Sequence, residues 1–230
     1  MNKQPVEQHL IDLKKRLRNS LLALAFTTVA GFIYSSRILS WLQDDLSLSL
    51  HALTAYEVFY TRISIALLFG LVMALPFIAL QLLKFAKPGL KPREYRVVRN
   101  YLPFSLILFS AGAVFSYQFV VKSALSFFST MTRASDVTAV WGLQNTIGFA
   151  VKLSAFSGLM FQLPVISVVL ASAGIIDKEM MVEHRGYFVV AVLLLSAVAT
   201  PPDVVTQVLV TLPVLGLYQV SIWLVGRYEH

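Results

Sequence analysis

The chain has 230 residues, of which 57% are apolar and only 13% are charged, and it contains no cysteine. Soluble domains carry about 25% charged residues, so this chain has too few charges to form a polar shell. The apolar content excludes intrinsic disorder, and the lack of cysteine excludes disulfide frameworks and cysteine metal sites. The composition therefore predicts an integral membrane protein.

Six apolar runs predict helices that cross the bilayer, for which about 20 predominantly apolar residues are needed. The predicted spans are residues 20–36, 63–83, 101–121, 153–173, 187–199 and 208–225. The last two are short, which indicates little tilt or a locally thin bilayer; a re-entrant hairpin is the alternative for this pair. The expected fold is all-α, with residues 1–230 forming one six-span membrane domain.

Four prolines lie in or at the ends of these runs: Pro76, Pro103, Pro164 and Pro213. Each lacks a backbone N–H and so removes one hydrogen bond from its helix. Proline is also common in membrane helices without a special role. Of the two interpretations we favour bent helices that enclose a concave surface.

The distribution of lysine and arginine predicts the orientation. With the N-terminus inside, 14 of the 19 basic residues lie in inner segments and five on the outer side. Cytoplasmic segments carry the excess of basic residues, so both termini are expected in the cytoplasm. The net charge of +7 is explained by attraction to anionic lipid headgroups. No nucleic-acid partner is expected, because the sequence lacks a basic patch interleaved with base-stacking aromatics.

Few polar groups fall within the predicted spans. None of the 12 acidic residues does, which argues against an ion-coupled pump. The four histidines lie in loops or termini, so an intramembrane serine would have no base, and no catalytic residue, metal site or cofactor is predicted. Lys152, near the outer end of the fourth run, is expected to snorkel to the headgroups. Gln162, near mid-bilayer, forms either an interhelical hydrogen bond or a polar recognition point.

The N-terminal segment predicts an interfacial amphipathic helix over residues 7–18. Its leucines recur at spacings of three and four, and charges occupy the opposite face: Leu10, Leu13 and Leu17 against Asp12, Lys15 and Arg16. The next inner loop is heavily basic but contains Glu94. Asp12 and Glu94 could together bind a pair of guanidinium groups. The simpler alternative is that each neutralises a nearby lysine or arginine.

At these positions the sequence resembles the TatC family of twin-arginine protein translocation. His9–Leu17 is similar to the N-terminal motif of that family, and the inner loop is similar to its first cytoplasmic loop at Phe85, Pro88, Leu90 and Glu94. Phe161–Pro164 matches the F-E-x-P site of the fourth helix except at one residue. The most specific match is Thr200-Pro201-Pro202-Asp203-Val204, followed by Gln207 and Pro213.

The resemblance implies the core receptor of a translocase that moves folded proteins by means of the protonmotive force, in a prokaryotic plasma membrane. The implied partners are twin-arginine signal peptides at the cytoplasmic face and single-span proteins of the TatA or TatB type. The working complex is expected to be oligomeric and surrounded by membrane lipids, and the chain itself is not expected to be an enzyme.

The resemblance also implies roles for particular residues. Signal-peptide arginines would bind at Asp12 and Glu94, beside Leu10, Lys14 and Arg16. A partner helix or a deeply inserted signal peptide would contact the intramembrane positions Gln162, Pro164, Thr206 and Gln207. The implied structural loop residues are Pro88, Pro201, Pro202 and Asp203.

The sequence departs from the family pattern at several positions. Asp12 replaces the usual glutamate and shortens the reach of the carboxylate, and Lys14 replaces the usual arginine and loses its planar fork. Gln162 replaces the intramembrane glutamate, which leaves hydrogen bonding but removes a charge. The first outer loop also lacks the family's proline, since none occurs between Pro5 and Pro76.

Two alternative functions remain open from the sequence. A six-span transporter or channel for small solutes would give solute flux in liposomes that contain this chain alone. A purely structural assembly platform would bind single-span proteins but ignore signal peptides.

Overall fold

The fold is given by a computed structural model that describes residues 6–86, 92–135, 139–201 and 203–229. Within these ranges the side chains of residues 6–9, 86, 93, 94, 97, 98, 101, 102 and 229 are not described. The helices are α1 Val6–Leu46, α2 Glu57–Ala86, α3 Pro92–Phe115, the π-helix η2 Ser116–Val121, α4 Lys122–Ala134, α5 Leu143–Met160, α6 Leu163–Ser172, α7 Lys178–Glu183, α8 Arg185–Ala199 and α9 Val204–Glu229.

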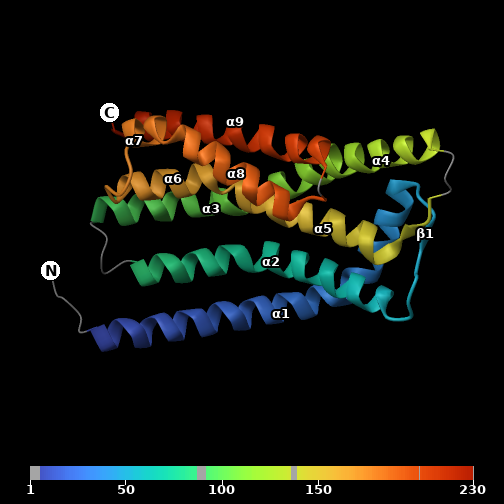
Figure 1. Cartoon of the computed structure of the whole chain (residues 1–230). Helices are drawn as coiled ribbons and strands as arrows, with labels where there is room; N and C mark the ends of the chain where they lie inside the picture. The colour runs from blue at the N-terminus through green and yellow to red at the C-terminus, as the bar shows by residue number, and fades with distance from the viewer. Residues whose placement is uncertain (1–5, 87–91, 136–138, 202, 230) are drawn as a thin grey trace.

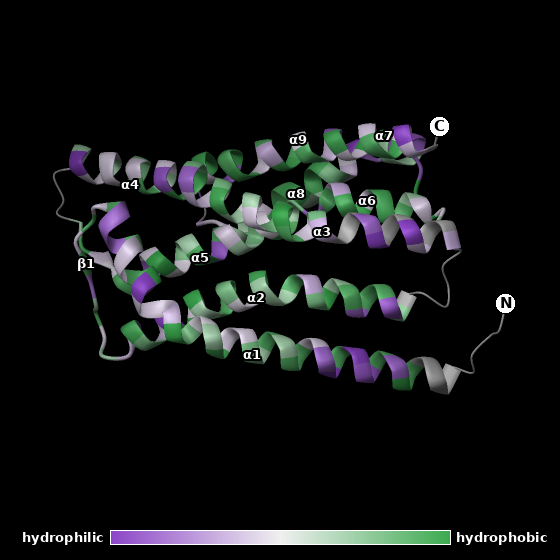
Figure 2. Ribbon diagram, turned by 180° about the vertical axis from the view of Figure 1, so that it is seen from behind, coloured by the Kyte–Doolittle hydropathy of each residue, from purple (hydrophilic) through white to green (hydrophobic). Residues whose placement is uncertain are grey.

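The chain is an all-α, multi-pass membrane protein. Among the described residues, five helical stretches are long and apolar enough to cross a bilayer: Leu10–Leu46, Glu57–Phe85, Pro103–Ala134, Leu143–Ser172 and Val204–Tyr228. The predicted span 187–199 lies in the shorter apolar helix α8. Hydrophilic residues gather toward the two ends of the bundle and hydrophobic residues along its middle (Figure 2).

The predicted boundaries at the N-terminus are wrong. The interfacial helix 7–18 and the span 20–36 are parts of one unbroken helix, α1, which continues to Leu46 (Figure 1). No proline or glycine occurs between Pro5 and Gly31, so the backbone hydrogen bonds run on through the junction. Ser47, with a left-handed φ of 52°, ends the helix.

Other boundaries also differ from the predicted ones. The third span 101–121 belongs to a helical stretch from Pro92 to Ala134, and the fourth begins at Leu143 rather than at 153. The prediction that the last span is short is wrong, since α9 has 26 residues. A count of apolar residues finds only the part of a helix that lies in the hydrocarbon. The backbone hydrogen bonds of the helix continue beyond that part.

Helices α1 and α2 pack closely because glycine lies where their backbones meet. A Cβ on Gly70 would lie 2.4 Å from the hydroxyl oxygen of Thr28, and one on Gly31 would lie 2.8 Å from the carbonyl oxygen of Ala66. The hydroxyl of Thr27 donates to the carbonyl of Gly70 at 2.8 Å. Small residues and such hydrogen bonds are the usual means of helix association in a membrane.

Of the four prolines, Pro164 coincides with an interruption of its helical stretch. Pro164 is near the start of α6, and the chain between α5 and α6 forms a turn at Phe161–Gln162. Helices α3, α2 and α9 continue through Pro103, Pro76 and Pro213.

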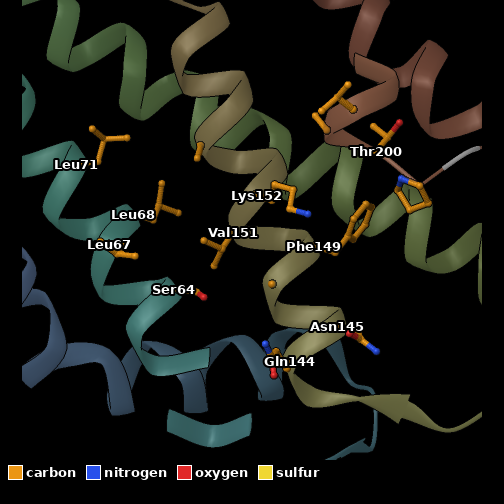
Figure 3. A pocket seen from close by; sticks show the side chains of 15 residues that line it. Ser64, Leu67, Leu68, Leu71, Gln144, Asn145, Phe149, Val151, Lys152 and Thr200 are labelled. Atoms are coloured by element: carbon orange, nitrogen blue, oxygen red, sulfur yellow. The ribbon is translucent and has the colours of Figure 1, made fainter. Parts of the chain in front are cut away.

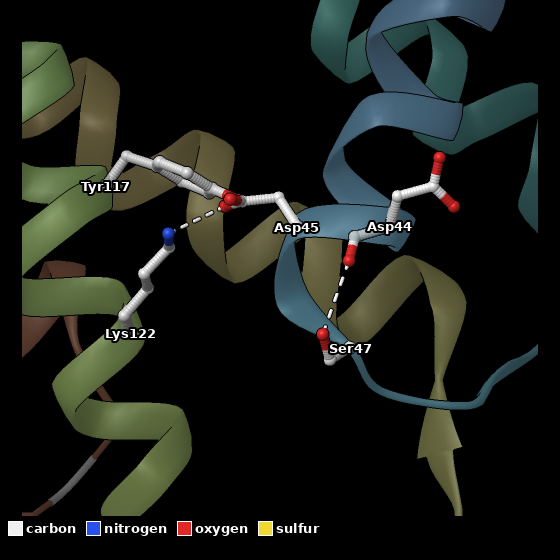
Figure 4. Close-up of polar contacts among 5 residues, drawn as sticks. All are labelled: Asp44, Asp45, Ser47, Tyr117 and Lys122. Carbon is white, nitrogen blue, oxygen red and sulfur yellow. Dashed lines mark hydrogen bonds and ion pairs between the residues drawn. The ribbon is translucent and has the colours of Figure 1, made fainter.

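The end of the bundle that carries β1, predicted to be the outer end, is joined by contacts between α1 and the third helical stretch. Asp45 accepts a hydrogen bond from the hydroxyl of Tyr117 at 2.5 Å and forms an ion pair with Lys122 at 2.8 Å (Figure 4). Beside them, the strands β1 Leu50–His51 and β2 Trp141–Gly142 form a short parallel pair. These contacts tie the first outer loop to the segment that precedes α5.

Helices α8 and α9 form a hairpin whose turn lies beside α5, short of the end of the bundle that carries β1 (Figure 1). At the opposite end Phe188 stacks on Tyr218 with ring centroids 3.8 Å apart, and the Tyr218 hydroxyl donates to the carbonyl of Met181 at 2.7 Å. The hairpin is therefore fixed at the end of the bundle where both termini of the described chain also lie (Figure 1).

We expect Gly70→Ala to destabilise the α1–α2 pair, because the new methyl group has no room against Thr28. Overpacking of this kind costs about 1–3 kcal/mol of the free energy of unfolding, measured by thermal unfolding in detergent. Gly216→Ala in α9 is the matched control, since nothing lies within 4 Å of its added Cβ. Equal stability of the two variants would contradict the close approach.

Candidate functional site

The cytoplasmic-end carboxylate predicted to bind a signal peptide lies near the start of α1. The Asp12 carboxylate pairs with the guanidinium of Arg16, one turn further along the helix, at 3.4 Å. The side chains are 39% and 23% exposed, respectively. In the chain without ligand, the carboxylate is thus neutralised locally, which is the simpler of the two interpretations considered from sequence. Leu10 and Lys14 on the same segment are exposed.

Glu94 lies in the first turn of α3, and its side chain is outside the described residues, as is all of Pro88. Helix α3 begins at the end of the bundle where α1 also begins (Figure 1). The fold therefore brings the backbone segments of Asp12 and Glu94 to the same end of the molecule. In sequence, the rest of α1 and all of α2 lie between them.

The intramembrane Gln162 forms hydrogen bonds within the chain. It is 7% exposed, its amide oxygen accepts from the Ser105 hydroxyl at 2.5 Å, and its amide nitrogen donates to the Ser105 carbonyl at 3.0 Å. These bonds join the α5–α6 turn to α3. Sequence reasoning did not identify Ser105, because the partners are 57 residues apart and a serine in an apolar run gives no distinguishing signal.

The turn at Gln162 follows from the buried residue Pro164, which has no N–H to donate to the carbonyl four residues earlier. The Phe161 N–H bonds to Ser157 and the Ile166 N–H bonds to Gln162, both at 2.9 Å, so the backbone hydrogen bonds resume around the interruption. Pro164 therefore determines where the Gln162 side chain leaves the helix.

The residues around the α8–α9 turn hold that turn together. Asp203 accepts from the Thr206 N–H at 2.6 Å and so caps α9. The Gln207 amide donates to the carbonyl of Leu193 at 3.1 Å, which fastens α9 to α8. Pro201 lies in this turn, whereas Pro202 is outside the described residues. Thr206 is fully buried, so it presents no surface to a partner in this conformation.

Metal-binding groups are not gathered in the part of the chain that the structure describes: no cluster of three or more histidine, aspartate or glutamate residues could hold an ion.

Comparison with known proteins identifies the family. Residues 8–213 match the family model described as Sec-independent protein translocase protein (TatC). The chain belongs to the TatC family. TatCy of Bacillus subtilis is 32% identical over 225 residues, covering 96% of this chain and 89% of TatCy. TatC of Carboxydothermus hydrogenoformans is 33% identical over 221 residues, covering 94% of this chain and 90% of that protein.

The three-dimensional structure agrees with the sequence match. The crystal structure of a twin-arginine translocase receptor TatC superimposes with a TM-score of 0.85 at 31% identity, covering 96% of this chain and 100% of that one. This TatC-family chain is therefore a multi-pass membrane component of the Sec-independent, twin-arginine protein translocase.

We expect Gln162→Leu to lower the free energy of unfolding by about 1–3 kcal/mol, because the buried Ser105 hydroxyl loses its acceptor. Thermal unfolding in detergent measures the effect, and adding Ser105→Ala should cost less than the sum of the two single changes. Gln118→Leu, at an exposed glutamine of η2, is the control. Wild-type stability of Gln162→Leu would show that the hydrogen bonds to α3 contribute nothing.

Proposed function

We propose that this TatC-family chain is the receptor that binds twin-arginine signal peptides at the cytoplasmic face of a prokaryotic plasma membrane. Both termini lie in the cytoplasm, and the role is recognition rather than catalysis. The proposal is supported by the excess of basic residues in the predicted inner segments, 14 against five. It is also supported by α1, which begins at the same end of the bundle at which α9 ends. The assembled complex, rather than this chain alone, exports folded proteins and uses the protonmotive force to do so.

Asp12 and Glu94 are the proposed acceptors for the two arginines of the signal peptide. A carboxylate binds guanidinium through two parallel charge-assisted hydrogen bonds, and both residues belong to segments at the same end of the bundle. This placement is the observation that carries the assignment, because a pair of neighbouring arginines needs two carboxylates within one site.

The Asp12–Arg16 pair does not prevent this role. A pair at this helical spacing that stays partly exposed contributes only about 0.3–0.5 kcal/mol, so an incoming arginine with bidentate geometry displaces Arg16 at small cost. The released Arg16 then joins Lys14 in facing anionic headgroups. The exposed Leu10, two residues before Asp12, offers an apolar contact to the hydrophobic part of the peptide.

The proposed membrane partners are single-span proteins of the TatA or TatB type, assembled with this chain into an oligomeric complex. Helices α8 and α9 present exposed apolar side chains to the lipid, among them Leu194, Val198 and Leu212. The hydrogen bond from Gln207 to Leu193 holds α8 and α9 together beneath this surface. Gln162 and Pro164 determine the shape of the α5–α6 turn. We infer that Gln162, Pro164, Thr206 and Gln207 act on a partner helix through this shape rather than by direct polar contact.

Binding of a fluorescent twin-arginine signal peptide to the purified chain in nanodiscs tests the proposal. Asp12→Asn and Glu94→Gln should each weaken binding about tenfold or more, since each removes a charged hydrogen-bond acceptor. Asp12→Glu should retain binding. Glu183→Gln, an exposed acid of α7, is the matched control.

A peptide with both arginines replaced by lysine should bind weakly to the wild-type chain, because lysine lacks the bidentate fork. Unchanged affinity of Asp12→Asn and Glu94→Gln would overturn the carboxylate assignment. Equal binding of the arginine and lysine peptides would overturn recognition of the arginine pair.

A further inference from the structure

A cavity with a volume of about 670 Å³ lies between α2, α5 and the end of α8 (Figure 3). That volume is within the usual range of small-molecule pockets. Its wall combines polar residues with an apolar stripe along α2, formed by Leu67, Leu68 and Leu71. On both α2 and α5 the polar residues come first in the chain, at Ser64, Gln144 and Asn145. Since both helices run inward from the outer end, the cavity is polar toward the outer side and apolar toward the inner side.

Lys152 is the one charged residue among those that line this cavity, all of which belong to the described ranges. It is exposed, and it makes no hydrogen bond or ion pair with the other described residues. Nine residues separate it from the start of α5 at Leu143, which places it about 14 Å along the helix. It lines the same cavity as Thr200 and Pro201 of the α8–α9 turn.

The length of α8 affects how far the polar surface of the bilayer lies from Lys152. Helix α8 has 15 residues, a length of about 22 Å, whereas the hydrocarbon core is about 30 Å thick. Thr200 and Pro201 of the turn form part of the cavity wall (Figure 3). A bilayer accommodates a short element by thinning around it, and thinning at α8 would bring outer-leaflet headgroups toward Lys152.

We propose that this cavity binds an anionic glycerophospholipid of the outer leaflet. The phosphate accepts hydrogen bonds from the Lys152 ammonium, and one acyl chain lies along Leu67, Leu68 and Leu71. An ammonium at membrane depth requires an anion, and the cavity wall supplies no carboxylate. The arrangement of charge, polar mouth and apolar stripe matches an amphiphile with one negative head.

A basic peptide is a poorer occupant of the same cavity. It would bring positive charge toward Lys152 and leave the ammonium without a counter-ion. Lipids with a choline head are disfavoured for a similar reason, because their ammonium would repel that of Lys152. The site is thus specific for net negative charge, and it is separate from the cytoplasmic residues proposed to bind signal peptides.

Photolabelling of the full chain in phosphatidylcholine nanodiscs tests the site. The probe is phosphatidylglycerol with a diazirine in its acyl chain, and labelled peptides are identified by mass spectrometry. We expect labelling of residues 64–71 and 144–155, competed by unlabelled phosphatidylglycerol but not by inorganic phosphate. A phosphatidylcholine probe with the same acyl diazirine should label these residues only weakly.

Lys152→Met should reduce labelling by phosphatidylglycerol about tenfold, because the charged hydrogen bond is lost, and Lys152→Arg should retain it. Lys84→Met, at an exposed lysine at the inner end of α2, is the matched control and should label as the wild type does. Leu67→Trp should reduce labelling without touching the charge, since Leu67 is half exposed and its replacement fills the apolar stripe. Thermal unfolding confirms that each variant is folded.

Several results would overturn the proposal. Wild-type labelling of Lys152→Met, or equal labelling by the phosphatidylcholine probe, would show that the charge does not select the lipid. Competition by inorganic phosphate would indicate a site for free anions. Loss of labelling on addition of a twin-arginine signal peptide would make the peptide the preferred occupant of the cavity.

Discussion

In hydrocarbon, a polar group has no water to bind, and this constraint decides how the helices of this protein are arranged. Backbone groups form their hydrogen bonds within each helix, so only a small number of polar side chains still need a partner. Gln162 bonds to Ser105, Thr27 bonds to the carbonyl of Gly70, and Arg62 bonds to the Ser35 hydroxyl at 3.0 Å. Each bond joins two helices, so satisfying the polar groups also sets the packing.

The substitution of glutamine for the family's glutamate at position 162 is consistent with this arrangement. An amide both donates and accepts, and here it exchanges one bond of each kind with Ser105. A carboxylate at the same place would accept only, or would have to be protonated. The chain thus retains a polar junction between α3 and the α5–α6 turn without placing a charge at mid-bilayer, which agrees with a role in recognition.

The α8–α9 hairpin pairs a short helix of 15 residues with one of 26. Its inner end is fixed by the stacking of Phe188 on Tyr218, and its turn is held by the Asp203 cap and the bond from Gln207. Thr200 and Pro201 of the turn line the cavity that contains Lys152. The hairpin therefore contributes to the shape of the proposed lipid site.

Sequence determined the class of protein, its all-α membrane fold and the family, because these depend on composition and short motifs that are read locally; the orientation stays a prediction from the charge asymmetry. It did not determine that residues 7–36 form part of one unbroken helix, since apolar content says nothing about where hydrogen bonding stops. The sequence identified Gln162 and Asp12 as candidate site residues. It did not identify their partners, Ser105 and Arg16. It gave Lys152 a place near the outer end of its helix, but not the cavity that this residue shares with α2 and the α8–α9 turn. The partner of a polar group is a matter of three-dimensional proximity, and only the tertiary structure decided it.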